Sequence, residues 1–361
     1  MRKIAVLTEN DCISSMIFNI FKEVTDIYYA NNLLEFQNYL SKNSGVILLD
    51  IFPCFLNNDI ISEIEFDLVI YGGMDIEKSA YLDINKYKGL FKCIKKGGFG
   101  IINSDDDISY RIVEGTDKIF LLTCGLNPKA SITASSISYS FKGVNFNYYI
   151  QRAVPTISNN EIIPQEIPVF INKLGISNIY NGLCAITAAL LFDIDVDIIK
   201  KALTGLPVKR RQMEVIYDYD FIVIDSYVTN FDSYEYVFET IQSMEYGDLF
   251  ILNSIKDIED FMEISEVYES WLKILNLKRL ILTNCSDIFP KKGGMCYNLL
   301  PFVNMVSNMG VCLEFYENFG DAVERLLDLV KKNDLVLFLG GESMNGAKSM
   351  FIDKFYLKNI S

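Results

Sequence analysis

The segment VLTENDCISSM, Val6 to Met16, decides the kind of fold to expect. The apolar run Ile4–Leu7 precedes its turn, and Ser14–Val24 follows it with apolar residues at helical spacing. A strand, a tight turn and a helix in this order are typical of a phosphate-binding loop. Such a loop needs glycines to bring backbone N–H groups onto phosphates and a lysine to neutralise them. This turn contains neither, so it has the position of a phosphate loop without its chemistry.

Strand-like and helix-like runs continue to alternate over the first two hundred residues, which indicates βαβ units and a largely parallel sheet. Between about Ile119 and Ile171 the pattern becomes strict alternation and predicts a small antiparallel excursion. The stretch Thr204–Val215, with glycine, proline and a run of charges, is the best linker. The other elements expected in this half are strands at Val46–Leu49, Asp67–Ile70 and Phe99–Ile102 and helices at Asn85–Lys95, Ser177–Phe192 and Val196–Leu203.

A second α/β series follows the linker and indicates a separate, doubly wound sheet. The sequence therefore predicts an α/β protein of two domains. A phosphate-loop-type domain with a mostly parallel sheet occupies residues 1–207, and a Rossmann-like doubly wound domain occupies residues 208–361. The elements expected in the second half are strands at Phe221–Asp225, Leu249–Leu252, Arg279–Leu282 and Leu335–Leu339 and helices at about Asp232–Ser243, Phe261–Leu275 and Asp321–Lys331.

Composition excludes several classes of protein. The net charge of −14 over 361 residues argues against nucleic acid or an anionic membrane as a partner. The eight cysteines form no CxxC pair and suggest reduced thiols, and acids interrupt every long apolar run, so we expect a soluble cytoplasmic protein. The chain has no histidine, which removes the commonest general base and the commonest neutral metal ligand.

Five stretches carry motif-like residues in a fixed order. They are IKKGGFGIINSDDD (Ile94–Asp107), GISNIYNGLCAITAALLFDIDVDIIKKALTGL (Gly175–Leu206), KRRQMEVI (Lys209–Ile216), VIDSYVTNFDSYEYVFETI (Val223–Ile241) and FGDAVERLLDLVKKNDLVLFLGGES (Phe319–Ser343). Together they resemble the Mur ligase family of ATP-dependent amide ligases, which join an amino acid or peptide to a carboxylate in cell-wall precursors and have folylpolyglutamate synthases as relatives. The resemblance implies a central ATPase-like domain at 1–207 and a Mur ligase C-terminal domain at 208–361.

Within this resemblance, Thr8–Ser15 falls where the family has T-G-T-N-G-K-T-T. Ile13 stands at the lysine position, and Glu9 and Cys12 stand at the two glycine positions. Glu9 and Asp11 place acid beside a polyphosphate, and two like charges about 4 Å apart cost roughly 1 to 4 kcal/mol. Because a millimolar nucleotide affinity is worth only about 4 kcal/mol, losses of this size can abolish binding.

Other positions keep the residue types that the resemblance assigns to the nucleotide site. Ser14 and Ser15 stand at the Thr-Thr positions, so a hydroxyl suited to magnesium survives at Ser14. Asp50 aligns with the family's central-domain glutamate and is a second hard oxygen ligand for the metal. The resemblance implies an adenine pocket lined by Asn178 and Asn181; alternatively, Asn178 or the preceding serine caps the helix.

Three further features have both a functional and a structural interpretation. Arg211 matches the family's phosphate-contacting arginine, or belongs to a solvated linker with Lys209 and Arg210. Asp225 binds a ribose hydroxyl at the end of a strand, or is an ordinary turn or capping group together with Asn230. The run Asn103–Asp107 offers three carboxylates to a cation, or forms a strand-ending turn with a helix cap, which we favour.

Some departures from the family remove chemistry. Its D-H motif is replaced by YGGMDIEKS at Tyr71–Ser79, and its closing lysine by Leu339. The lysine that is carbamoylated in many members falls at Tyr87, although Lys86 and Lys88 flank it and a one-residue shift could restore it. The phosphate-loop position also comes so early that we expect the preceding domain, which holds the UDP-sugar in cell-wall members, to be absent.

The leading hypothesis is a Mur ligase-like pseudoenzyme with a degenerate phosphate loop, kept as a binding or regulatory protein and needing no cofactor. The alternative is an active ATP-dependent ligase that uses Mg²⁺ and an acyl phosphate to form an amide in cell-wall-related or polyglutamate-type metabolism. A third hypothesis is a scaffold whose protein partner is an active ligase or an amidotransferase. The sequence identifies no catalytic residue and no substrate.

Overall fold

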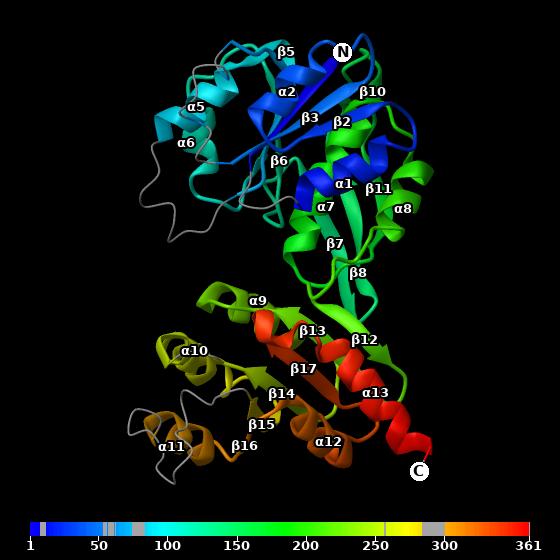
Figure 1. The fold of residues 1–361 in the computed structure, drawn as a ribbon. Coiled ribbons are helices and arrows are strands. Elements are labelled where there is room, and N and C mark those ends of the chain that lie inside the picture. Colours follow the sequence, from blue (N-terminus) through cyan, green and yellow to red (C-terminus); the bar gives the residue numbers. More distant parts are fainter. Residues whose placement is uncertain are drawn as a thin grey trace. The chain divides into compact units, whose positions relative to one another are not determined.

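The computed structural model describes residues 1–7, 12–52, 56, 61, 63–73, 84–255, 258–283 and 300–360, apart from the side chains of 258–263 and 359–360. The chain forms two compact units. The first contains residues 1–138 and 143–207, and the second contains residues 139–142 and 208–361. Each unit is a layered α/β structure with a sheet between helices (Figure 1).

A nine-stranded sheet in the order β11-β8-β7-β6-β5-β4-β1-β3-β2 forms the centre of the first unit. Strands β1 to β6 run parallel, whereas β8 and β11 pair antiparallel. Every residue of β3 and β4 is buried, as central strands with both faces covered require. The strands are β1 (Arg2–Leu7), β2 (Ile27–Ala30), β3 (Val46–Ile51), β4 (Phe66–Tyr71), β5 (Ile94–Asn103), β6 (Phe120–Cys124), β7 (Ile132–Ser140), β8 (Gly143–Ile150) and β11 (Gln165–Ile171), with a separate hairpin of β9 (Val154–Pro155) and β10 (Glu161–Ile162).

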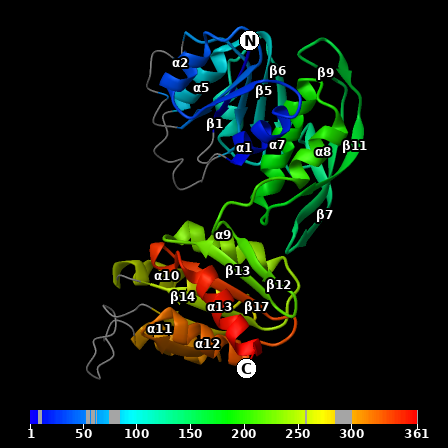
Figure 2. The ribbon, with the colours of Figure 1, turned by 45° about the vertical axis from the view of Figure 1, so that its right-hand side comes forward.

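Helices cover both faces of this sheet. Helices α1 (Cys12–Phe21), α7 (Ser177–Leu191) and α8 (Val196–Thr204) lie together on one face in both ribbon views (Figures 1 and 2). Helices α2 (Leu33–Tyr39), α5 (Ile84–Lys92) and α6 (Ser109–Val113) contribute Phe36, Tyr87, Phe91 and Ile112 to the core on the other face. The sheet is therefore buried between two apolar layers.

The strand order places a topological switch point at β1. Strand β1 lies between β3 and β4, so the chain leaves β1 for one side of the sheet and later crosses to the other. In open α/β sheets, ligands bind at the carboxyl ends of the strands at such a point. Residues 8–11, which join β1 to α1 there, lie outside the described residues.

The second unit has a six-stranded sheet in the order β12-β13-β17-β14-β15-β16. All pairs are parallel except the antiparallel pair of β12 and β13. Its strands are β12 (Glu214–Asp218), β13 (Ile222–Tyr227), β14 (Leu249–Ser254), β15 (Leu277–Thr283), β16 (Cys312–Tyr316) and β17 (Leu335–Gly340). Its helices are α9 (Phe231–Gln242), α10 (Ile258–Trp271), α11 (Leu300–Asn308), α12 (Phe319–Leu329) and α13 (Ala347–Ile360), with the short η3 (Glu342–Met344).

Two helical layers enclose this second sheet. Helices α12 and α13 pack on one face over a core that includes Phe319, Phe338 and Phe351. Helix α10 contacts α9 and α11, and these three form the opposite layer (Figure 2). The doubly wound arrangement expected from the sequence is therefore present.

The structure confirms the α/β class with large, mostly parallel sheets, and the antiparallel excursion is present in β8 and β11. Several elements were not predicted, including β2, α2, β12, α11, β16 and α13; β12 begins within the expected linker. Strand β5 was expected to start at Phe99 but starts at Ile94, because Gly97 takes a left-handed φ of +75° and allows a register shift in the strand. Among the described residues, no helix combines the length and apolar character needed to cross a bilayer.

Candidate functional site

A buried group of oxygen atoms lies near the carboxyl end of β1 in the first unit. Asp50 of β3 pairs in register with Val6 of β1 and is 3% exposed. The Ser14 hydroxyl, in the first turn of α1, donates a hydrogen bond to one carboxylate oxygen of Asp50. The Tyr29 phenol, on β2, donates to the other oxygen. The structure thus brings together Ser14 and Asp50, which the resemblance assigns to the metal, and adds Tyr29, which the sequence did not reveal.

This group fits a magnesium ion only in part. A serine hydroxyl and a carboxylate are the hard oxygen ligands that Mg²⁺ prefers. Each carboxylate oxygen of Asp50 accepts one hydroxyl proton and keeps a second lone pair. Ile13, at the lysine position, packs in the core with 1% exposure and brings no charge. Across the described part of the chain, no three His, Cys, Asp or Glu residues are grouped so that they could hold a metal.

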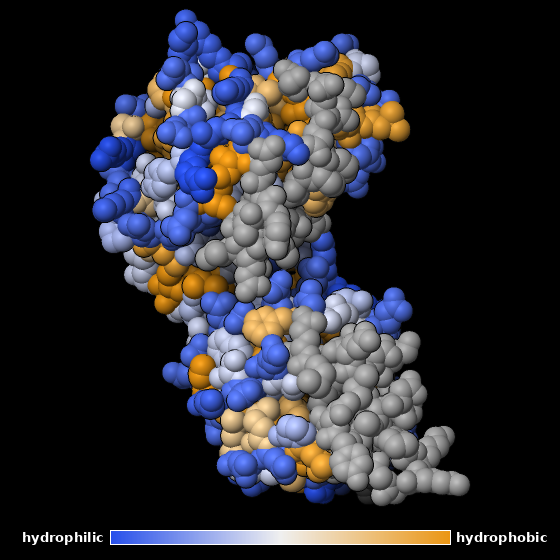
Figure 3. Space-filling view, turned by 90° about the vertical axis from the view of Figure 1, so that its left-hand side faces the viewer, coloured by the Kyte–Doolittle hydropathy of each residue, from blue (hydrophilic) through white to orange (hydrophobic). Residues whose placement is uncertain are grey.

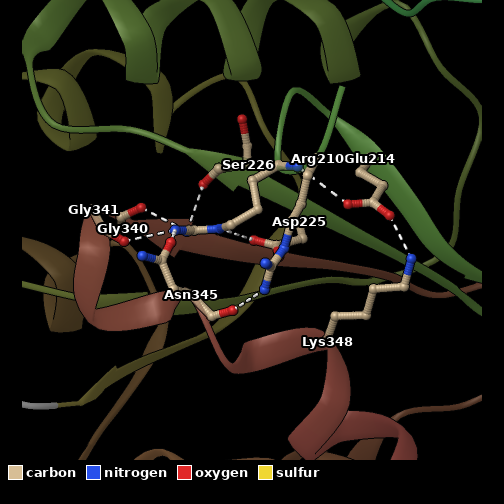
Figure 4. Close-up of polar contacts among 9 residues, drawn as sticks. Arg210, Glu214, Asp225, Ser226, Gly340, Gly341, Asn345 and Lys348 are labelled. Atoms are coloured by element: carbon tan, nitrogen blue, oxygen red, sulfur yellow. Dashed lines mark hydrogen bonds and ion pairs between the residues drawn. The ribbon is translucent and has the colours of Figure 1, made fainter. Parts of the chain in front are cut away.

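In the second unit, Asp225, Ser226, Gly340, Gly341 and Asn345 lie close together (Figure 4) and supply acceptors that enclose Arg211. It is 3% exposed, and its Nε donates to Asp225 Oδ1 at 2.9 Å. The two Nη atoms donate to four further oxygens, so each of the five guanidinium N–H groups has an acceptor. These oxygens are Gly341 O (2.6 Å), Asn345 Oδ1 (3.2 Å), Gly340 O (2.7 Å) and Ser226 O (3.4 Å). The interpretation of Arg211 as part of a solvated linker is therefore wrong, because the side chain fills a built polar site.

The same pairing defines the surroundings of Asp225. Its side chain is buried, and burial raises the pKa of its carboxyl although the Arg211 hydrogen bond lowers it. Asp225 lies on β13 beside Phe338 of β17, and Gly340 ends that neighbouring strand. Asp225 is thus a strand residue with an internal cation, not a turn or capping group. Asn230 does cap α9, through a capping box with Ser233, as the structural interpretation predicted.

Comparison with known proteins agrees with this architecture. The family model described as "Mur ligase middle domain" matches residues 80–189. The chain is 28% identical over 215 residues to the UDP-N-acetylmuramoyl-L-alanyl-D-glutamate–2,6-diaminopimelate ligase of Caldanaerobacter subterraneus, covering 58% of this chain and 42% of that protein. It is 22% identical over 286 residues to the UDP-N-acetylmuramate–L-alanine ligase of Caldicellulosiruptor saccharolyticus, covering 77% and 59%. The matched region thus spans about half the length of these relatives.

Solved structures show the same fold. A structure of a UDP-N-acetylmuramoyl-L-alanyl-D-glutamate–2,6-diaminopimelate ligase gives a TM-score of 0.75 at 16% identity, over 98% of this chain and 79% of the other. MurF ligase from Thermotoga maritima in complex with ADP gives 0.64 at 12% identity, over 99% and 81%. The chain thus has the fold of the solved Mur ligases, and its residues 80–189 match the Mur ligase middle domain.

The residues predicted for an adenine pocket lie at the start of α7. The Asn178 side chain is buried and donates to Leu174 O at 2.6 Å. Asn181 is half-buried on the same helix. The capping alternative is wrong, because Ile176 already has helical backbone angles and occupies the N-cap position without a side-chain hydrogen bond. The nucleotide assignments of Asn178 and Asn181 stay predictions.

The run Asn103–Asp107 forms the turn that we favoured. Asp105 accepts hydrogen bonds from the β6–β7 turn and from Tyr180 of α7, and Asp106 accepts from the start of α6 and from β4. The donors are Leu126 N (2.6 Å), Asn127 N (3.2 Å) and Tyr180 Oη (3.0 Å) for Asp105, and Ile108 N (2.9 Å) and Tyr71 Oη (2.7 Å) for Asp106. These carboxylates tie loops together at the carboxyl edge of the first sheet.

Helix α5 shows what occupies the carbamoylated-lysine position. Tyr87 points into the core with 2% exposure, and its ring lies edge-on to Tyr71 with centroids 6.5 Å apart. Lys86 is exposed, and Lys88 pairs with Glu114 at 2.9 Å. A one-residue shift therefore does not restore a lysine to this site, because the inward position on the helix is Tyr87.

The remaining predicted positions are described in part. Ser15 is half-buried, and its carbonyl accepts from Asn19 Nδ2 at 2.8 Å. Leu339, at the closing-lysine position, is fully buried in β17. Residues 8–11 of the loop and 74–79 of the replaced D-H motif lie outside the described residues.

Proposed function

We propose that this chain is a Mur ligase family member that has lost most or all ATP-dependent amide ligation and acts as a binding or regulatory protein. The observation that carries the proposal is the internal pairing of the residues that would hold MgATP. Asp50 accepts hydroxyl protons from Ser14 and Tyr29, and Arg211 is paired with Asp225. Each group therefore has a protein partner where the resemblance implies a ligand.

The energetic argument follows from burial. Arg211 and Asp225 have side chains that are 4% and 2% exposed. Breaking a buried pair of this kind leaves an uncompensated charge and costs about 3 to 5 kcal/mol. A millimolar nucleotide affinity is worth about 4 kcal/mol, so moving Arg211 onto a phosphate would consume most of it. The loop offers no lysine in return, and the chain has no histidine.

The alternative is an active ligase with a remodelled site. The direct contact of Ser14 with Asp50 supports it, because the two predicted metal ligands remain adjacent. One structural neighbour is named as an ADP complex, and the relatives are named as ligases. In this case the first unit would offer the nucleotide Ser14, Ser15, Asn178 and Asn181, with Mg²⁺ at Ser14 and Asp50. The second unit would offer Arg211 and Asp225. ATP would activate a carboxylate as an acyl phosphate for attack by an amine.

A regulatory role calls for a protein partner, for which we propose an active ligase or an amidotransferase. Exposed apolar side chains are present in both units and include Tyr110, Ile163, Tyr219 and Tyr356. In the space-filling view, apolar residues form small groups among hydrophilic ones (Figure 3).

A calorimetric titration of MgATP into the purified protein tests the proposal. We expect no binding tighter than about 1 mM, with AMP giving the same result. A parallel assay follows release of ADP and phosphate. Magnesium-dependent binding that prefers ATP, together with ADP release, would refute the proposal and support the ligase. In that case Asp50→Asn should abolish both signals.

A further inference from the structure

A cluster of aromatic side chains extends from the core of the second unit to its surface, where α13 runs beside β12 (Figures 1 and 2). Tyr217 of β12 has its ring centroid 5.8 Å from that of Phe351 and 4.8 Å from that of Phe355, both on α13. Tyr217 also contacts Tyr219 at 5.4 Å, and Phe355 contacts Tyr356 at 6.2 Å. Tyr219 is 86% exposed and Tyr356 is 62% exposed. We call Tyr217, Tyr219 and Tyr356 the tyrosine ridge.

Packing supports the tyrosine ridge from below. Tyr217 and Phe355 are partly buried against the apolar core that contains Phe221 and Phe351. The centroid distances lie in the range in which aromatic rings attract each other. Rings that are ordered before binding lose little conformational freedom when a partner arrives. Exposed aromatic rings in mutual contact, unlike single exposed ones, are typical of an interaction site.

Carboxylates surround the ridge. Asp218 and Asp220 lie on either side of Tyr219 in the sequence, and both are exposed. Burial raises the pKa of the Tyr217 phenol, and the nearby Asp220 carboxylate raises it further. Within the described part of the chain, neither carboxylate forms an ion pair. The exposed rings are therefore accompanied by negative charge that the second unit leaves unpaired.

The lysines of the second unit do not cover the ridge. Lys354 and Lys358 of α13 pair with acidic residues of α12. Lys331 and Lys332 precede a turn that donates a backbone hydrogen bond to Asp220 O at 2.7 Å. Neither of these two ammonium groups forms an ion pair among the residues that the structure describes. A cation from another molecule can therefore reach both the ring faces and the carboxylates.

We propose that the tyrosine ridge binds an arginine-bearing segment of a partner protein. A guanidinium stacks on the negative face of an aromatic ring and also pairs with carboxylates, and both kinds of acceptor are present here. The net charge of −14 attracts a basic segment to this chain. A second copy is a poorer occupant, because a symmetric contact would bring the same carboxylates against each other. The inference rests on the proposed function, since it names the chemistry of the partner that a regulatory role calls for.

The test measures how tightly the full chain binds a capped, fluorescently labelled peptide of alternating arginine and glycine, by fluorescence anisotropy. We expect Tyr219→Ala combined with Tyr356→Ala to weaken binding about 5- to 30-fold relative to the wild type. Tyr219→Phe combined with Tyr356→Phe should bind as the wild type does, because both ring faces remain. Tyr110→Ala is the matched control, since that tyrosine is also exposed but lies in the first unit. It should leave the affinity unchanged.

A second comparison separates the ridge from the overall charge of the chain. Asp218→Asn combined with Asp220→Asn should weaken peptide binding by about 2-fold or more. Glu266→Gln combined with Glu269→Gln removes the same net charge from exposed positions of α10 and should have a smaller effect. Equal losses in these two double variants would overturn the proposal, because the attraction would then be nonspecific.

Other outcomes also decide. Absence of peptide binding by the wild type, or equal binding by the wild type and the alanine double variant, would overturn the proposal. Sedimentation of the protein alone tests the second occupant, since a dimer that the alanine substitutions dissociate would make the ridge an interface between copies. If the wild type releases ADP and phosphate from MgATP, the proposed loss of ligation fails, and the peptide comparison still tests the ridge. If ligation is absent and binding does not depend on the rings, only the ridge proposal fails.

Discussion

At the scale of single residues, Arg211 makes the strongest prediction. Its guanidinium donates hydrogen bonds to five acceptors. If the arginine is removed, Asp225 loses its cation, and the carboxylate is too deeply buried for water to solvate its charge. Arg211→Ala should lower the free energy of unfolding of the second unit by about 3 to 5 kcal/mol, measured by urea denaturation. Arg210→Ala is the control, because that neighbouring side chain is exposed and bonds only to Asn345 O among the contacts described. Equal losses in the two variants would contradict the structural role of Arg211.

Single residues also show which parts of the candidate site could be predicted from the sequence. Ser14 and Asp50 were predicted because the motifs that resemble the family occur in the same order, so these two residues could be aligned with positions of known type. Tyr29 was missed because a tyrosine in a short strand gives no local sign of a hydrogen bond to a residue 21 positions away. The pairing of Arg211 with Asp225 was missed for a similar reason. Each was interpreted separately, as a ligand contact or as part of a linker or turn. The antiparallel register of β12 with β13, which places Glu214 opposite Asp225, is what brings Arg211 beside that carboxylate.

At the scale of elements, Asp67 ties three strands together at the amino end of β4. It accepts from Arg2 Nη1 and from the Lys3 backbone N–H of β1, each at 2.8 Å, and from Lys95 of β5. Burial alone would raise the pKa of Asp67, but these donors outweigh it and hold the pKa below its usual 3.8. A carboxyl with a depressed folded-state pKa stabilises the protein above its unfolded pKa, and this contribution is lost as the pH falls through the folded value.

Asp67→Asn should therefore destabilise the first unit by about 1 to 3 kcal/mol near neutral pH. The difference from wild type should shrink as the pH falls below 3.8, because the wild-type carboxyl then becomes protonated. Urea unfolding at a series of pH values measures both effects. Asp218→Asn, at an exposed position, is the control. A difference that stays constant from pH 7 to pH 3 would show that the charge of Asp67 is not what stabilises these strands.

Helices and strands were predicted correctly where their apolar pattern extends over many residues, and they were missed where the element is too short to show a pattern. Helix α7 and strands β3, β4 and β17 were found because long helical spacing or continuous apolar runs identify them. Strand β2 has four residues and α2 has seven, so neither presents enough of a repeat to stand out. The missed strand is the one that carries Tyr29, which is why the candidate site was incomplete.

At the scale of the whole molecule, each unit has its own sheet and its own apolar core, so each should report its own stability. We expect Arg211→Ala to reduce amide hydrogen-exchange protection in peptides from residues 208–360 and Asp67→Asn to reduce it in peptides from residues 1–207. Protection is read by mass spectrometry on the full chain, with β17 and β4 as the most informative peptides because both strands are buried throughout. If either substitution loosened both sets of peptides equally, the two cores would be one cooperative unit. The ion pairs of Asp67 and Arg211 would then depend on the folding of the whole chain.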